Sequence, residues 1–342
     1  MFVSFIEDMG LSPVAYRNKM REPEKKRTHV HAFHRLNSAT MVAEFCFGRK
    51  GRLNKNSAFF SMLCVLAAAM LWGTTGTIQG LLPLSREPVV VAAVRVLLGS
   101  AALWLFCLFS GVSVRTIRTL PRWRIFGAGT AIAGYNLFFF AGVAHAGVGV
   151  GTAIALGSGP LWVLAYEILF SARRPSGRSL TGQVAAIAGL AILVAGDAGG
   201  QGSYLGYGLS ALAGLSYGTY VYLTGGIGKN ANSALVAATT FSVASIVLAP
   251  SLILFSTAWI DLRSIALLAF LGFAATGVAF FLFTFGLQRM PASTAVTLTL
   301  AEPLTAWFLA TTVLGEPVTL PKVIGAAMLV IGIRVVAGES QQ

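Results

Sequence analysis

The sequence predicts an all-α integral membrane protein, with ten transmembrane helices arranged as two inverted five-helix repeats. Three observations support this fold class. Of the 342 residues, 56% are hydrophobic and only 11% are charged, whereas a soluble domain carries about 25% charged residues. The chain after residue 57 is a nearly continuous series of apolar runs. The two halves of that series also match each other in sequence.

Residues 1–57 differ from the rest of the chain, because they hold eleven Lys and Arg and five Asp and Glu. The apolar start Met1–Ile6 is followed by acids and then by a basic stretch, with no small-residue cleavage site after a long apolar core, so we do not expect a secretory signal here. We interpret this segment as a basic, partly disordered cytosolic leader. An artefact of an upstream start codon is the alternative, since Met41 and Met62 lie near the first span.

Metal and disulfide chemistry are not indicated. His29, His31 and His34 lie in the leader, and a metal would need a fixed geometry that a mobile tail does not provide. The three cysteines are odd in number and scattered along the chain, so they form neither a disulfide framework nor a metal pattern. We therefore predict no metal site and no cofactor.

Apolar segments long enough to cross a bilayer, which takes about 20 helical residues, follow Ser57 one after another. They lie near 58–80, 88–110, 123–143, 148–170, 180–197, 204–224, 234–256, 264–286, 291–313 and 319–337. Ten such spans leave only short connections, so no soluble catalytic domain fits after the leader. The even number places both termini on the same side of the membrane.

The basic residues predict which side that is. With a cytoplasmic N-terminus, the inside segments hold 21 Lys and Arg, and the outside segments hold only Arg86, Arg263 and Lys322. Cytoplasmic loops carry such an excess in membrane proteins. We therefore expect a multi-pass plasma-membrane protein with both termini in the cytoplasm. The same bias, rather than a nucleic-acid partner, accounts for the net charge of +13.

An internal repeat divides the spans into residues 58–197 and 204–337. An offset of 145 places Trp72-Gly73-Thr74 over Tyr217-Gly218-Thr219, Phe126-Gly127 over Leu271-Gly272 and Tyr135 over Phe280. An offset of 143 places Pro160-Leu161 over Pro303-Leu304, Gly182 over Gly325 and Gly189 over Gly332. Chance matching of common residues is the alternative. Because each half has five spans, the second half enters the membrane from the opposite side, an arrangement typical of secondary transporters.

Several short motifs occur within this repeat. They are Leu71-Trp72-Gly73 in span one, Arg95 in span two, the paired Pro160 and Pro303, Leu314-Gly315-Glu316-Pro317 at the end of span nine, and Gly325 and Gly332 in span ten. Together with the ten spans, they make residues 58–337 similar to the EamA-type permeases of the drug/metabolite transporter (DMT) superfamily. One departure is Ser171-Ala172-Arg173 in the first repeat, where such families often show Gly-Glu; an acid at this place is present only at Glu316.

The resemblance implies a proton- or exchange-driven carrier of small organic solutes, commonly an efflux permease of the cell inner membrane. In similar proteins, spans 1, 3, 4, 6, 8 and 9 form a central cavity and spans 5 and 10 pack behind it. Substrates across the superfamily include amino acids, drugs, nucleotide sugars and phosphorylated sugars, so the resemblance selects no single one. A homodimer is left open.

Two charged residues are candidates for the substrate or proton pathway. Glu302 lies at the middle of span nine with Thr299 nearby, and a charge there costs about 2.5–3.5 kcal/mol on insertion scales. It could exchange a proton or pair with a substrate amine; the alternative is a hydrogen-bonded packing residue. Arg95 could bind an anionic group or pair with an acid, or it could extend outward to the interface. Glu167, near the inner end of span four, is expected to extend outward in the same way.

Pro160 and Pro303 mark matching mid-span positions at which a helix loses a backbone hydrogen bond. Ser158, between two glycines, further loosens the first position. Interrupted helices at matching places in two repeats point to a binding site, whereas a plain packing kink is the alternative. Aromatic or amide side chains at mid-depth could contact an organic substrate or simply pack; these candidates are Trp72, Tyr135, Asn136, Tyr217 and Phe281.

The sequence therefore favours a membrane transporter for a small molecule, with an exporter as the expected direction. A passive channel or a non-transporting receptor is the alternative. An intramembrane enzyme is disfavoured, because only His145 could serve Ser158 as a base, and it lies at a predicted outer turn. We predict that the chain is not an enzyme.

Overall fold

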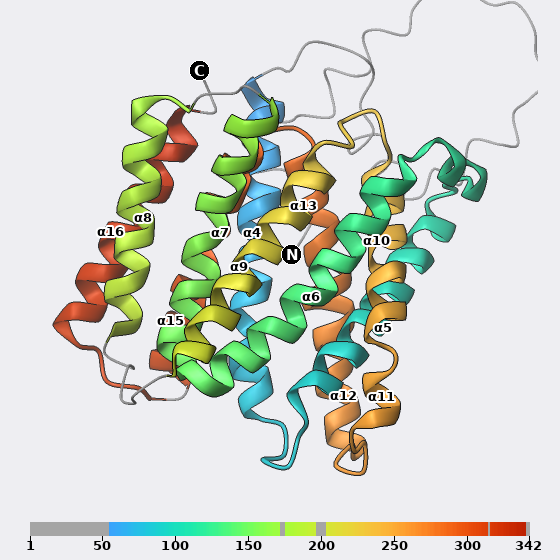
Figure 1. The fold of residues 1–342 in the computed structure, drawn as a ribbon, viewed down its shortest axis with the longest axis horizontal. Coiled ribbons are helices and arrows are strands. Elements are labelled where there is room, and N and C mark those ends of the chain that lie inside the picture. The colour runs from blue at the N-terminus through green and yellow to red at the C-terminus, as the bar shows by residue number, and fades with distance from the viewer. Residues whose placement is uncertain (1–54, 172–174, 196–202, 314, 340–342) are drawn as a thin grey trace, which may run out of the picture. The chain divides into compact units, whose positions relative to one another are not determined.

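The computed structural model describes residues 55–171, 175–195, 203–313 and 315–339, with side chains from residue 58. Residues 1–54 of the leader, which include its three histidines, lie outside the described residues, and α4 begins at Lys55. All regular elements in the described part are helices (Figure 1). They are α4 (Lys55–Gly80), α5 (Pro88–Phe109), η1 (Val114–Thr119), α6 (Arg122–Ala146), α7 (Val148–Ser171), α8 (Gly177–Ala195), α9 (Tyr204–Gly225), α10 (Ser233–Leu248), α11 (Ser251–Leu254), α12 (Leu262–Gly272), η2 (Phe273–Val278), α13 (Ala279–Leu287), α14 (Ala292–Leu298), α15 (Ala301–Val313) and α16 (Leu320–Glu339).

The helices confirm the predicted all-α membrane fold. Within the described residues, nine helical stretches are long and apolar enough to cross a membrane, and α9 is not among them. Five glycines and five tyrosines lower the hydropathy of this 22-residue helix, which packs against α6 and α7. The count of ten spans therefore stays a prediction.

Three spans of the second half are segmented. Predicted span seven comprises α10 and α11, and span nine comprises α14 and α15. In span eight, the π-helical segment η2 separates α12 from α13, and Thr276 Oγ1 donates to the Leu271 carbonyl at 2.8 Å. Their counterparts α5, α6 and α7 in the first half are continuous. The two repeats thus share their order of spans but differ in local regularity.

Each of the main helix–helix contacts between the halves has a counterpart in which both helices are replaced by their equivalents in the other half. Helix α4 packs on α13 and α15, and its counterpart α9 packs on α6 and α7. Counterparts α5 and α10 pack on each other, as do α8 and α16 (Figure 1). In the α8–α16 pair, Gly182 faces Gly332 and Gly189 faces Gly325, so these equivalent helices run antiparallel. This is the contact pattern of two repeats with opposite orientation.

The α8–α16 pair depends on glycine. A Cβ at position 189 would lie 2.5 Å from the Leu329 nitrogen and 2.7 Å from the Gly325 oxygen, both backbone atoms. We expect Gly189→Ala to lower the unfolding free energy by about 1–3 kcal/mol, the usual range for an overpacked site, and to lower the melting temperature in detergent by several degrees. Gly208→Ala on α9 is the control, because a Cβ there meets no atom within 4 Å. Equal melting temperatures of the two variants would contradict this packing.

Candidate functional site

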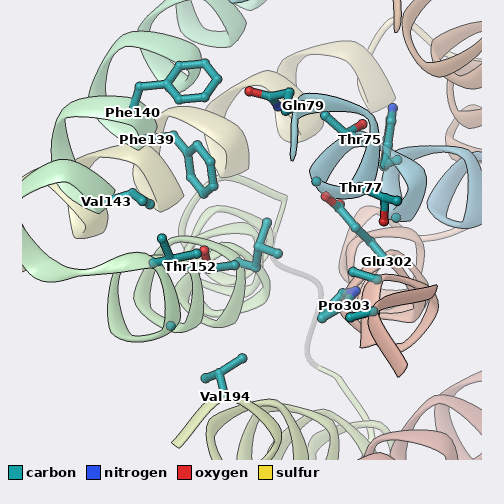
Figure 2. A pocket seen from close by; sticks show the side chains of 18 of the residues that line it. Thr75, Thr77, Gln79, Phe139, Phe140, Val143, Thr152, Val194, Glu302 and Pro303 are labelled. Atoms are coloured by element: carbon teal, nitrogen blue, oxygen red, sulfur yellow. The ribbon is translucent and has the colours of Figure 1, made fainter. Parts of the chain in front are cut away.

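A cavity of about 610 Å³ lies between the two halves (Figure 2). Each half supplies part of the wall: α4, α5, α6, α7 and α8 from the first, and α9, α13, α15 and α16 from the second. Glu302 and Pro303 face Phe139 and Thr152 across the space. Spans 2, 5 and 10 also contribute, which corrects the expectation that spans 5 and 10 only pack behind the cavity.

The cavity extends from mid-span toward one end of the helices. Its lining on α7 stops at Leu156, and its lining on α4 starts at Trp72, so the other halves of these helices do not take part. Arg86 and Glu316 line this end from connections between spans, and Lys322 lines it from the first turn of α16. We call it the open end. Lys322 Nζ donates to Glu316 Oε2 at 3.3 Å. The predicted orientation places this end outside the cell.

The opposite end is closed by polar contacts. Glu167 on α7 accepts hydrogen bonds from the backbone nitrogens of Ala292 at 2.9 Å and Ser293 at 3.4 Å, at the start of α14. Tyr166 and Thr219 share a hydrogen bond of 2.9 Å between their hydroxyls. Glu167 is buried, so the expectation that it extends outward is wrong. Instead, it joins α7 of the first half to α14 of the second half.

Glu302 is placed by a break in span nine. Helix α14 ends at Leu298 and α15 begins at Ala301, and the Glu302 nitrogen donates to the Thr299 carbonyl at 2.9 Å. Pro303 lacks the amide hydrogen that would have used that carbonyl. The Glu302 carboxyl therefore lies in the first turn of α15, where a helix favours negative charge. Gly73 lets α4 contact this turn closely, since a Cβ there would lie 2.7 Å from the Glu302 oxygen.

Arg95 on α5 is the cation that lines the middle of the same cavity, whereas Arg86 and Lys322 line its open end. Its Nη2 donates to Asn136 Oδ1 at 3.3 Å, and Asn136 Nδ2 donates to the Ile132 carbonyl at 2.8 Å. Its buried Nε has no hydrogen-bond partner among the described residues. Arg95 and Glu302 interact electrostatically, yet the structure records no ion pair within 4.0 Å between them. The guanidinium lies in the cavity wall, which favours the pathway role of Arg95 over the alternative that it extends outward to the interface.

Aromatic side chains form part of the lining of the central cavity. The Tyr135 ring lies 5.4 Å from that of Tyr217, and the Trp72 ring lies 4.6 Å from that of Phe280. Four of the five predicted mid-depth residues line the cavity: Trp72, Tyr135, Asn136 and Tyr217. Phe281 does not; it packs on Phe106, and its neighbour Phe280 lines the cavity instead. Adjacent helical positions point about 100° apart, so a one-residue difference changes the face.

Three further predicted residues lie outside the cavity lining. Pro160 is buried inside α7, which continues through it without a break, contrary to the expected interruption. Ser158 packs against Gly214 of α9. Thr299 lies behind the wall and accepts a hydrogen bond of 3.3 Å from the Tyr217 hydroxyl. Their direct contact with a substrate therefore stays a prediction without support from the geometry.

Two donors in the cavity wall were not predicted from the sequence, Trp307 Nε1 and Thr75 Oγ1. Like Nε1 of the predicted Trp72, they are buried and have no hydrogen-bond partner among the described residues. Trp307 lies four residues after Pro303 and Thr75 three after Trp72, spacings that place two residues on one face of a helix, so a helical projection from the chosen residues could have found them. Together with Arg95 Nε, they leave the cavity ready to bind acceptor atoms.

Comparison with known proteins agrees with this architecture. Residues 59–195 and 204–338 each match the model of the EamA-like transporter family. The chain is 33% identical over 284 residues to an uncharacterized transporter, YwfM, of Bacillus subtilis (strain 168), covering 82% of this chain and 94% of that protein. A crystal structure of a protein of 21% identity, covering 80% of this chain and 95% of that one, superposes with a TM-score of 0.71, which supports the fold alone. The chain belongs to the EamA-like transporter family and is a multi-pass membrane transporter of the DMT type.

Proposed function

We propose that the chain is a secondary active exporter of small organic metabolites, such as amino acids or drug-like solutes, working by alternating access around a mid-membrane site. The observation that supports this is the one-sided cavity, which holds Arg95 from one repeat and Glu302 from the other. A solute with an acceptor group and an amine would find a partner for each at its base, with aromatic rings around its apolar part.

The proposed orientation places both termini in the cytoplasm and the open end of the cavity outside. The charge bias of the connections supports it. In this state the external side has access to Glu302, and the contacts of Glu167 and Tyr166 close the cytoplasmic side. Alternating access requires that these contacts break when the external end closes.

A passive channel or a receptor is the second candidate. A conducting channel needs a path to both faces, and the cavity lining that the structure describes includes none of the inner half of α7. We propose no enzymatic role, because Ser158 packs on Gly214 outside the cavity lining. Saturable counterflow, in which a gradient of one substrate drives another uphill, distinguishes a carrier from a channel.

The first test compares the metabolites outside cells that overexpress the chain with those outside cells carrying an empty vector. We expect at least one small organic solute to accumulate outside the expressing cells. The same solute, loaded into proteoliposomes that contain the purified chain, should then drive counterflow of its labelled form. Conduction without saturation or counterflow would favour the channel and contradict the proposal.

A further inference from the structure

A second, smaller cavity lies on the outer surface of the helices, away from the central one. It has a volume of about 130 Å³ and lies where η1 and the start of α6 meet α10. Its walls are mostly apolar, with a single charged residue, Arg122. The lining residues are Ile117, Leu120, Arg122, Ile125, Phe126, Thr239 and Val243. We call it the η1 groove. Nothing in the proposed transport cycle uses it.

Three arginines lie on η1 and at the start of α6, the two elements that form one side of the η1 groove. Arg115 and Arg118 are exposed on η1, three residues apart, which places them on one face of a 3₁₀ helix. Arg122 is exposed at the start of α6 and lines the groove itself. No acidic residue occurs between Ser110 and Ala146, so this end of α5 and α6 is strongly positive.

The surface next to the arginines is apolar and aromatic. Phe126 is 65% exposed and lies one turn beyond Arg122 on α6, and Trp123 is 63% exposed. The Arg124 guanidinium lies 4.8 Å from the centroid of the Trp123 ring. Exposed tryptophan at the end of a span is typical of the headgroup level of a bilayer. On α10, Ile246 is exposed one turn beyond Val243, so the groove is continuous with a surface that lipid covers.

We propose that the η1 groove binds an anionic phospholipid, with its phosphate against Arg115, Arg118 and Arg122 and part of an acyl chain between η1, α6 and α10. Charge complementarity and the apolar groove support the same ligand. Clusters of basic residues next to a span attract anionic lipids, and the groove accepts the chain attached to such a headgroup. A soluble anion would use only the arginines, and a zwitterionic lipid would use mainly the groove.

The test uses the purified full-length chain and native mass spectrometry after exchange of its lipids. We expect phosphatidylglycerol to remain bound in preference to phosphatidylcholine. The triple variant R115A/R118A/R122A should lose this preference by at least tenfold, since each basic residue near an anionic surface contributes roughly a fivefold factor in binding. The matched control is R178A/K229A/R334A, which removes the same charge from other exposed residues and should keep the preference.

Two further variants separate the headgroup from the chain. R115K/R118K/R122K keeps the charge and should keep most of the preference. Val243→Phe fills the groove while leaving the arginines, and should weaken binding of both lipids. Glycerol phosphate, a soluble headgroup without acyl chains, should not displace the lipid. The proposal is wrong if both triple-alanine variants behave alike, if the parent chain shows no preference, or if glycerol phosphate competes while Val243→Phe has no effect.

Discussion

Replacing Glu302 by Gln should reduce pH-driven transport to the level of empty vesicles. The amide cannot take up or release a proton, and Glu302 is the carboxyl at the base of the central cavity, in the first turn of α15. Gln keeps the size and the hydrogen-bonding capacity of the side chain, so folding and expression should not change. The measurement is uptake of labelled substrate into proteoliposomes under an imposed pH gradient, once the metabolite comparison has named the substrate.

Glu87→Gln is the matched control for this variant. Glu87 lies directly before α5, on the side of the membrane that is predicted to be outside. Its side chain makes no capping hydrogen bond and does not line the cavity. It should transport like the parent chain. Counterflow without a pH gradient should survive in Glu302→Gln if the residue carries only the proton, and should fail if it also binds a substrate amine. Normal pH-driven transport by Glu302→Gln would remove this residue from the mechanism.

Removing the Glu167 carboxyl should open the end of the transporter that is closed in this structure. Glu167→Ala leaves the backbone amides of Ala292 and Ser293 without their acceptor, and an unpaired buried donor costs about 1–3 kcal/mol. The substitution therefore destabilises the closed state but not the open one, because water can hydrogen-bond to these amides once this end opens. About 1.4 kcal/mol corresponds to a tenfold change in the population of the open state.

Labelling of a cysteine at position 163 measures that population. Val163 is fully buried on α7, one turn before Glu167 on the closed side. We expect Val163→Cys to react with a small maleimide about tenfold faster in the Glu167→Ala background than in the parent background. Glu167→Gln retains an acceptor oxygen and should label close to the parent rate. Equal rates in all three backgrounds would mean that Glu167 does not hold this end closed.

Much of the fold could be predicted because its signals are local. Long apolar runs predict membrane helices directly, and the repeat of Gly182 and Gly189 at positions 325 and 332 predicted two related halves. The segmentation of the second half could not be predicted in the same way. Pro160 and Pro303 occupy matching positions, yet α7 is continuous and span nine is broken. A proline removes the same hydrogen bond in both helices, and the surrounding packing decides whether the helix ends there.

The candidate site could be predicted only where chemistry restricts a residue. Glu302 and Arg95 were identified because charge in a span is costly, and both line the cavity. Phe281 and Ser158 were chosen by depth, and depth does not say which side of a helix faces the cavity. Glu167 was misread because an acid near the end of a span can reach water or a buried amide, and only the position of α14 decides between them.

The exchange of contacts between the halves bears on how the chain enters the membrane. Such packing is isologous, like that of a two-fold dimer. Two identical units would carry identical loop charges. Because the positive charges of the loops set the orientation, both units would then insert in the same sense. Here the corresponding loops differ in part: an offset of 145 places Arg263 over Arg118, but Ile260 over Arg115 and Leu267 over Arg122. The two halves make equivalent helical contacts but differ in loop charge. This difference lets them insert into the bilayer in opposite orientations within a single polypeptide.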